Sequence, residues 1–467
     1  MTPTLWLGVA TVVTLICGVW LARHLQRRPV PRILAFVVLV LFFRFVLSAF
    51  HPLTFPALIG PFSINALYSI LVTGLGLLLI DKRLLLLKFL LPVYGLFAVI
   101  LLSALLNGTL VLSIETLLKW LFFVVIALAL FEALMRVERG LVLESLLRAF
   151  SVPLVLQVLA IVLGYSKRSE SDGSISYVGG YHHEAVFSVI LVTALVLAAM
   201  VQLDRAGRGG RGSGMLPLLI AVLVMFTNYR TSIIAMLLPL TGYIYFRFIR
   251  QGAPLMKVCA SVVLACATIG IGFMDFSHII ERFSEIGMVM DSLADLVKAP
   301  AYYTEWEQDY FSARLYIWSQ YLDGFVNGGT LQYLIGHGAD SWTGLFAKYA
   351  HNTFVSYLYE LGILGTLALA YLFLRNMGRC WSRPLTTYGL FLFLAFGAFL
   401  IMNLGTMPLW QIEGVALFAM LSAFAWTLQW EPLLQEAAAA EQPADQDETS
   451  ADGDGAWARR GEGPVMQ

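Results

Sequence analysis

Two arginines and one histidine are the residues of this 467-residue chain that are best suited to chemistry. Arg230 interrupts an otherwise apolar stretch over 215–248, Arg314 lies in a polar segment, and His351 directly precedes another apolar run. A planar guanidinium binds phosphate through paired hydrogen bonds. A histidine titrates near neutral pH and can serve as a general base. These side chains therefore indicate chemistry on an anionic, phosphate-containing substrate.

Each of the three also has a plainer interpretation. Arg230 could anchor the chain to lipid headgroups, and Arg314 could be a solvated residue on a helix surface. His351 could begin a helix without taking part in chemistry, although helix-start N–H groups there would favour a bound phosphate. The residue types alone leave both interpretations open.

Five further residues are candidates for substrate binding. Arg44 and Lys119 would place positive charge inside predicted membrane helices, where ionisable groups are costly and usually functional. Glu115 lies four residues before Lys119, so the two can pair. The His182-His183-Glu184 sequence lacks a third ligand at metal-binding spacing, so we predict no metal there. The five candidates are Arg44, Lys119, His183, Tyr310 and Asn352.

The composition is that of a membrane protein. The chain is 59% hydrophobic and only 13% charged, with a mean hydropathy of +0.78. Soluble domains are about 45–50% apolar and about 25% charged. Thirty basic residues balance thirty acidic ones, so no overall field recruits nucleic acid. The four cysteines fit no disulfide or metal framework, and no nucleotide-binding, serine hydrolase or zinc protease motif occurs.

We expect an all-α polytopic fold with 12–13 transmembrane helices, because a spanning helix needs about 20 apolar residues. The predicted spans are 4–21, 33–50, 62–80, 84–106, 111–131, 141–164, 185–203, 215–228, 231–248, 256–274, 352–374, 385–402 and 409–430. Two amphipathic helices are predicted between the tenth and eleventh spans, at 277–298 and over Phe311–Phe325. The apolar stripe of the second consists of Phe311, Leu315, Trp318, Leu322 and Phe325.

The basic residues predict the orientation. Alternate connections hold nineteen Lys and Arg, whereas the opposite connections hold six. The richer set should be cytoplasmic. The embedded charges then fall in the outer half, which predicts a polar cavity open to the outside. The predicted domains are a membrane part over 1–274, a large outer loop over 275–350, a second membrane part over 351–430 and a disordered acidic cytoplasmic tail over 431–467.

Three segments occur in a distinctive order: NYRTSI at 228–233, ARLYIWSQYLDGF followed by LIGHG across 313–338, and HNTFVSYLYELGILG at 351–365. Together they resemble the bacterial superfamily of O-antigen ligases and of O-antigen and exopolysaccharide polymerases. This resemblance implies a GT-C-like integral-membrane glycosyltransferase that uses a glycan on undecaprenyl diphosphate as donor. It also implies that Arg230 and Arg314 hold the diphosphate and that His351 is a candidate base.

The resemblance further implies a metal-independent, inverting transfer without a cofactor, in the bacterial inner membrane and facing the periplasm. The acceptor would be a glycan or lipid A-core, with membrane lipid and polysaccharide-assembly proteins as further partners and no nucleic acid. Thirteen predicted spans, Tyr229 before the first arginine and the acidic tail depart from the compact ligase pattern. These departures favour a polymerase over a ligase.

Two other functions remain open. Many spans with embedded charges would also suit a transporter or flippase for a polysaccharide or lipid-linked substrate. The acidic tail could instead dock a cytoplasmic partner to a non-catalytic scaffold. A transporter would expose sites in the inner half of the membrane, and a scaffold would depend on residues 436–467.

Overall fold

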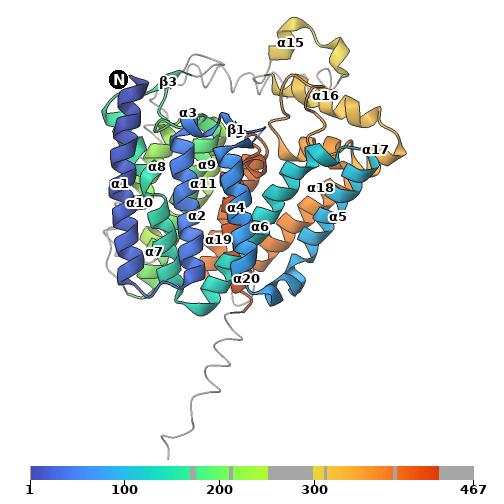
Figure 1. Cartoon of the computed structure of the whole chain (residues 1–467). Coiled ribbons are helices and arrows are strands. Elements are labelled where there is room, and N and C mark those ends of the chain that lie inside the picture. The colour runs from blue at the N-terminus through green and yellow to red at the C-terminus, as the bar shows by residue number, and fades with distance from the viewer. Residues whose placement is uncertain are drawn as a thin grey trace, which may run out of the picture. The chain divides into compact units, whose positions relative to one another are not determined.

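The computed structural model describes residues 2–60, 62–168, 175–209, 214–250, 298–309, 313–381 and 386–430, and this part of the chain is almost entirely helical (Figure 1). Residues 1–428 form one compact unit. Its sheet content in the described ranges is limited to two short antiparallel hairpins, β1 (Ala57–Ile59) with β2 (Phe62–Ser63) and β3 (Lys167–Arg168) with β4 (Ile175–Ser176).

The apolar helices make up most of this unit. They are α1 (Pro3–Arg27), α2 (Arg32–Ala49), α4 (Ile64–Leu79), α5 (Leu91–Leu106), α6 (Leu110–Arg136), α7 (Arg139–Ala149), α8 (Ser151–Val162), α9 (Glu184–Gly207), α10 (Leu216–Met225), α11 (Arg230–Ile244), α18 (Thr353–Arg379), α19 (Thr387–Asn403) and α20 (Ile412–Thr427).

Shorter helices complete the described fold. They are α3 (His51–Thr54), α15 (Glu305–Asp309), α16 (Arg314–Val326), α17 (Thr330–Ile335), η1 (Lys82–Leu86), η2 (Lys88–Leu90), η3 (Tyr245–Arg250, which continues α11 as a π-helix), η4 (Pro300–Tyr302) and η5 (Pro408–Trp410).

The fold confirms an all-α polytopic membrane protein. Within the described ranges, seven helices are long and apolar enough to cross a membrane, and the bent pair α7 and α8 would make an eighth. Four shorter apolar helices, namely α4, α10, α19 and α20, bring the apolar segments to 7 + 1 + 4 = 12. These twelve correspond to twelve of the thirteen predicted spans. The thirteenth, 256–274, and the predicted helix 277–298 lie outside the described residues.

Three helices form the centre of the bundle. Helices α6, α9 and α20 are apolar on all sides, as expected for helices surrounded by others, and most of their side chains are buried. Phe418 of α20 stacks on Phe123 of α6 at 5.1 Å between ring centroids. This stack ties the last helix of the unit to the sixth, so the two halves of the chain share one core.

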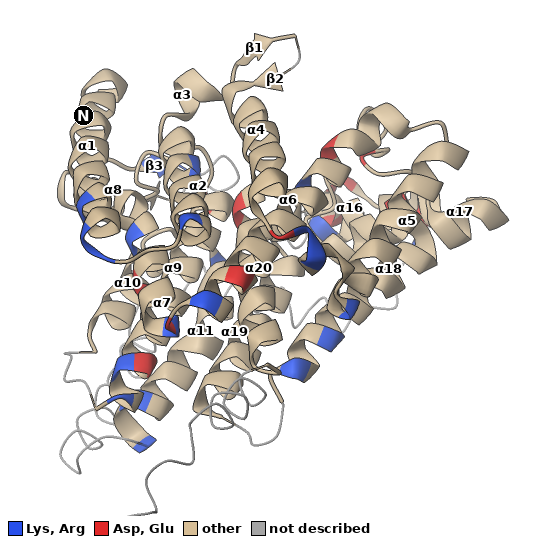
Figure 2. Cartoon of the chain, turned by 60° about the horizontal axis from the view of Figure 1, so that its bottom comes forward, with Lys and Arg blue, Asp and Glu red and all other residues tan. Residues whose placement is uncertain are grey.

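Contacts between distant segments define one end of the bundle, which we call the basic end. There Arg205 Nη2 pairs with Glu144 Oε1 at 2.7 Å, and His24 Nε2 lies 2.9 Å from Ser145 Oγ. Arg250 Nη1 donates to Thr387 Oγ1 at 3.0 Å. Figure 2 turns this end of the bundle forward, with Lys and Arg in blue. The predicted sorting of basic connections to one face is therefore seen in the fold.

The opposite end, which we call the site end, carries the helices that lie outside the bundle. Helices α15, α16 and α17 stand above α18 and α5 in Figure 1, at the end where α18 begins. A second, smaller hydrophobic cluster lies there, centred on Ile317, Tyr321, Ala350, Tyr359 and Met407. This cluster joins α16 to α18 and to the connection between α19 and α20.

The buried side of α16 differs from the predicted stripe. Ile317 and Tyr321 are its buried hydrophobic residues, and Tyr321 contacts Phe346 and Tyr359. Leu322, a member of the predicted stripe, is 40% exposed. The predicted stripe is wrong at this position, because Tyr321 lies outside it and yet packs its ring in the cluster while its hydroxyl donates to the Lys348 carbonyl at 3.2 Å.

Helix α18 is broken near its first third. Gly362 has φ 65° and ψ −164°, which no helical residue adopts. The break exposes two carbonyl groups, and the 336–338 turn satisfies them: His337 N donates to Tyr359 O at 3.0 Å and Gly338 N to Glu360 O at 2.8 Å. Irregular backbone at membrane depth is tolerated only with such partners. These hydrogen bonds hold the short helical segment that begins at Thr353 in place at the site end.

Candidate active site

Arg230 stands at a turn between two membrane helices, as predicted. Helix α10 ends at Met225, and Asn228 then adopts the left-handed conformation with φ 53°. Asparagine is among the residues that adopt this region most readily. Tyr229 is the N-cap of α11, so Arg230 is its first residue and is exposed at the site end.

Arg314 reaches the same region from α16. Its Nη2 donates to the Gly405 carbonyl oxygen at 3.4 Å. The Tyr229 hydroxyl donates to the same carbonyl oxygen at 3.2 Å. A single backbone oxygen therefore joins the Arg314 side chain to the residue that precedes Arg230, although 85 positions separate Tyr229 from Arg314 in the chain.

His351 lies at the start of α18, and the Arg314 charge acts on its imidazole. Its backbone is left-handed, with φ 52°, a strained conformation that is uncommon outside glycine and often marks functional sites. Its ring lies 4.0 Å from the Tyr349 ring, and Tyr349 stacks on Trp410 at 5.0 Å. Asn352 Oδ1 accepts from Phe354 N at 2.9 Å, so this predicted substrate-binding residue also caps α18.

The surroundings of His351 keep its imidazole neutral. Burial lowers the pKa of His351 to about 4, and the positive charges of Arg314, His183 and Lys348 act in the same direction. A neutral imidazole has one nitrogen with a lone pair, which can accept a proton. Burial and the neighbouring Tyr229 raise the pKa of Tyr349 to about 12, so Tyr349 keeps its proton.

The other candidates have contacts of several kinds. His183 Nδ1 accepts from Ala185 N at 3.0 Å and caps α9. Lys119 Nζ pairs with Glu115 at 2.7 Å, as its spacing predicts, and lies 5.2 Å from the Trp410 ring centre. Tyr310 lies outside the described residues.

Arg44 is held by a carboxylate of its own. Its Nε donates to Glu413 Oε1 at 2.9 Å, and the Ser48 hydroxyl donates to the same oxygen at 2.9 Å. Both side chains are largely buried, so the pair links α2 to α20 inside the membrane bundle. A buried charge needs such a partner, because its desolvation costs several kcal/mol.

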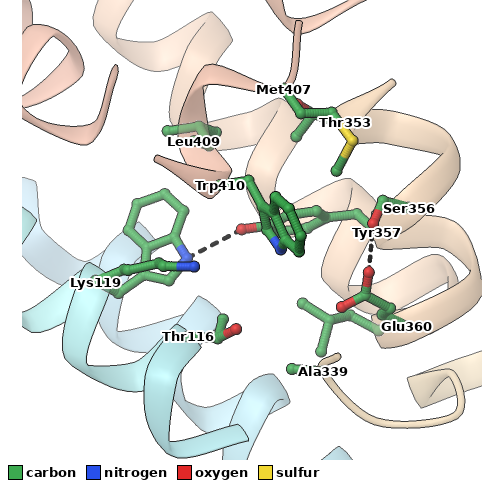
Figure 3. A pocket seen from close by; sticks show the side chains of 12 residues that line it. Thr116, Lys119, Ala339, Thr353, Ser356, Tyr357, Glu360, Met407, Leu409 and Trp410 are labelled. Carbon is green, nitrogen blue, oxygen red and sulfur yellow. Dashed lines mark hydrogen bonds between the residues drawn. The ribbon is translucent and has the colours of Figure 1, made fainter. Parts of the chain in front are cut away.

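A small pocket lies below Trp410, between α6, α18 and η5 (Figure 3). Glu360 Oε1 accepts from Ser356 Oγ at one wall, and Tyr357 accepts from Trp120 Nε1 at 3.0 Å across it. The pocket has room for one or two water molecules and not for a sugar. Among the embedded charges, Arg44 pairs with Glu413, whereas Lys119 and Glu360 both line this pocket.

Sequence reasoning missed the segment that joins these residues. Gly405 accepts from Arg314 and Tyr229, and Trp410 stacks on Tyr349. Both lie between α19 and α20, where Gly405 and Pro408 signal only a turn. A local signal of that kind does not tell which distant side chains the turn will meet.

Residues 215–370 match the family model described as O-antigen ligase. This match supports the resemblance of that part of the chain to the superfamily of O-antigen ligases and polymerases. The matched range contains Arg230, Arg314 and His351 and ends before the connection between α19 and α20. It supports an activity of the ligase or polymerase type and, with it, lipid-linked glycan and acceptor substrates. A search of curated proteins gave no match for the chain.

Proposed function

We propose that the chain transfers a glycan from undecaprenyl diphosphate to a sugar hydroxyl of an acceptor at the periplasmic face of the inner membrane. The observation that carries this proposal is that three distant segments of the range matched by the family model come together. Arg314 and Tyr229 share the Gly405 carbonyl, and His351 lies within electrostatic reach of Arg314.

The proposed reaction forms one bond and breaks another at C1 of the donor sugar. The acceptor oxygen attacks C1, and the bond from C1 to the diphosphate oxygen breaks on the opposite side, which inverts the anomeric centre. The electron pair leaves with the diphosphate, where Arg230 and Arg314 would stabilise the growing negative charge. The acceptor proton passes to the neutral imidazole of His351. The guanidinium groups take the charge-stabilising role that a metal ion has in other transferases.

The location of these residues suits a lipid-linked donor. Arg230 begins a membrane helix and is exposed at the site end, so a diphosphate at the membrane surface could meet it while the lipid tail stays between helices. Backbone N–H groups at the same helix start would add favourable partial charge. A transporter would need a path through the basic end as well, and the proposal does not require one.

Alanine substitutions test the roles of the three residues. We expect Arg230→Ala, Arg314→Ala and His351→Ala each to lower glycan transfer by about 100-fold or more, since loss of one preorganised donor costs about 10²–10³ in rate. Transfer is measured as glycan length on gels and as turnover of lipid-linked donor by the full chain in vesicles.

Arg168→Ala is the matched control, because Arg168 is an exposed arginine in the short strand β3 and has no part in the proposed mechanism. Amounts of membrane-inserted protein must be equal for all variants. Long glycan chains from all three alanine variants would contradict the proposal.

The same readout separates the two acceptor classes. Deletion of a polymerase should leave single repeat units, and we favour this outcome because of the departures from the compact ligase pattern. Deletion of a ligase should leave polymer on the carrier lipid instead.

A further inference from the structure

The last residue of α19 and the connection to α20, together residues 403–411, contact all three segments of the proposed site. Its Gly405 oxygen accepts from Arg314 and from Tyr229. Asn403 Oδ1 accepts from Thr353 Oγ1 at 2.7 Å, just after His351. This connection lies outside the range that matches the family model.

We infer that residues 403–411 act as a positioning element. Gly405 positions the Arg314 guanidinium next to the start of α11, and Trp410 supports the stack of rings that runs through Tyr349 to His351. The inference rests on the proposed function, because it assigns the site the task of placing Arg314 and His351 around one substrate.

Gly405 is suited to this task because it lacks a side chain. A Cβ there would lie 2.7 Å from Thr231 Oγ1, 3.0 Å from Thr231 Cγ2 and 3.4 Å from Arg314 Nη1. Thr231 is β-branched and therefore stiff at χ1. Rotation about χ1 would still leave Oγ1 or Cγ2 close to the added Cβ. The absence of a Cβ lets the Gly405 carbonyl, the first turn of α11 and the Arg314 guanidinium come together.

Trp410 works at the other end of the same segment. Its ring stacks on Tyr349, whose ring contacts His351. Its Nε1 donates to Asp340 Oδ1 at 3.3 Å, and Lys119 lies over its face. The contacts with Asp340 and Lys119 thus fix the indole ring. The indole in turn orients the Tyr349 ring, which contacts the imidazole of His351.

Gly405→Ala is the first test, made in the full chain in lipid nanodiscs. A displacement of about 1 Å at a reacting centre can lower a rate by about 100-fold, and we expect a loss of that order in glycan transfer. Thr231→Ala removes both clashing atoms, so the loss caused by Gly405→Ala should be at least about tenfold smaller in the Thr231→Ala background.

Gly378→Ala is the matched control, because a Cβ at Gly378 meets no atom within 4 Å and the residue lies near the basic end of α18. It should transfer glycan at the level of the unmodified chain. Trp410→Phe keeps a ring on Tyr349 and should retain more transfer than Trp410→Ala.

A second readout asks whether Gly405 acts through Arg314. Binding of undecaprenyl diphosphate should weaken in Gly405→Ala and in Arg314→Lys, and the double variant should bind no more weakly than the weaker single variant. Independent losses that simply multiply would overturn the inference, as would wild-type transfer by Gly405→Ala or failure of Thr231→Ala to reduce the loss. Wild-type transfer by all three of Arg230→Ala, Arg314→Ala and His351→Ala would overturn the proposed function itself, which keeps the two failures distinct.

Discussion

At the scale of single residues, the candidate site combines charged guanidinium groups with a neutral imidazole. Arg314 donates to a backbone carbonyl, which fixes its direction without neutralising its charge. His351 is strained, partly buried and surrounded by positive charge. Because burial and those neighbours disfavour the charged form, the imidazole holds no proton near neutral pH, which the proposed role as proton acceptor requires.

The pH dependence of kcat/KM follows from this environment. The ordinary pKa of histidine is about 6.5, and that of His351 is lowered to about 4. His351 therefore stays unprotonated as the pH falls through 6.5 and loses its basic form only as the pH approaches 4. We expect kcat/KM to stay level from about pH 8 to about pH 5.5, since this ratio reports the free enzyme.

A pH series of donor turnover in vesicles measures this profile, and His351→Gln provides the control for ionisations elsewhere. An acid limb centred near 6.5 that disappears in His351→Gln would contradict the neutral, depressed histidine.

At the scale of elements, the break in α18 gives the site its shape. The turn at 336–338 donates to the carbonyls that the break exposes, so the outer segment and the membrane helix are joined by backbone hydrogen bonds. Gly336 makes this approach possible: a Cβ there would lie 2.2 Å from the carbonyl carbon of Glu360. Backbone atoms cannot rotate away as a side chain can, so this contact admits only glycine.

Gly336→Ala should therefore prevent the turn from docking on α18. We expect a large loss of folded protein, beyond the roughly 1–2 kcal/mol that a left-handed residue other than glycine costs. Thermal unfolding of the purified chain, with size-exclusion profiles, measures the effect.

Gly344→Ala is the matched control for Gly336→Ala. Gly344 also has a positive φ, of 83°, but a Cβ there meets nothing within 4 Å. Equal stability of the two variants would show that docking on the break does not matter.

At the scale of the whole molecule, charge divides the bundle into two ends. The basic connections meet at one end, and Arg230, Arg314 and His351 lie at the other. Basic loops are retained in the cytoplasm. The proposed site should then face the periplasm, where a lipid-linked glycan would reach it from the membrane surface.

Cysteine labelling tests this orientation. In a chain whose four native cysteines are replaced by alanine, we expect Leu345→Cys to react with a membrane-impermeant maleimide in spheroplasts. Gly207→Cys, at the basic end of α9, should react only after the membrane is opened. Both residues are exposed, so access to the reagent is the variable. The reverse pattern would place the proposed site in the cytoplasm.

The sequence by itself determined the helical class, twelve described apolar segments, the sorting of basic connections and the Glu115–Lys119 pair. Hydropathy, the positive-inside rule and i,i+4 spacing are local properties, so they can be read along the chain. It also indicated Arg230, Arg314 and His351 by residue type, although their catalytic roles stay predictions.

Only the tertiary structure decided what these residues meet. Arg44 pairs with Glu413 across 369 positions, and Gly405 joins Tyr229 to Arg314. The break at Gly362 was also missed, because a glycine inside an apolar run does not reveal whether a loop will satisfy the carbonyls it frees. Such contacts depend on how whole helices pack against one another. Packing is set by side-chain volumes and by how closely two backbones approach, and no spacing of residues along the chain encodes either.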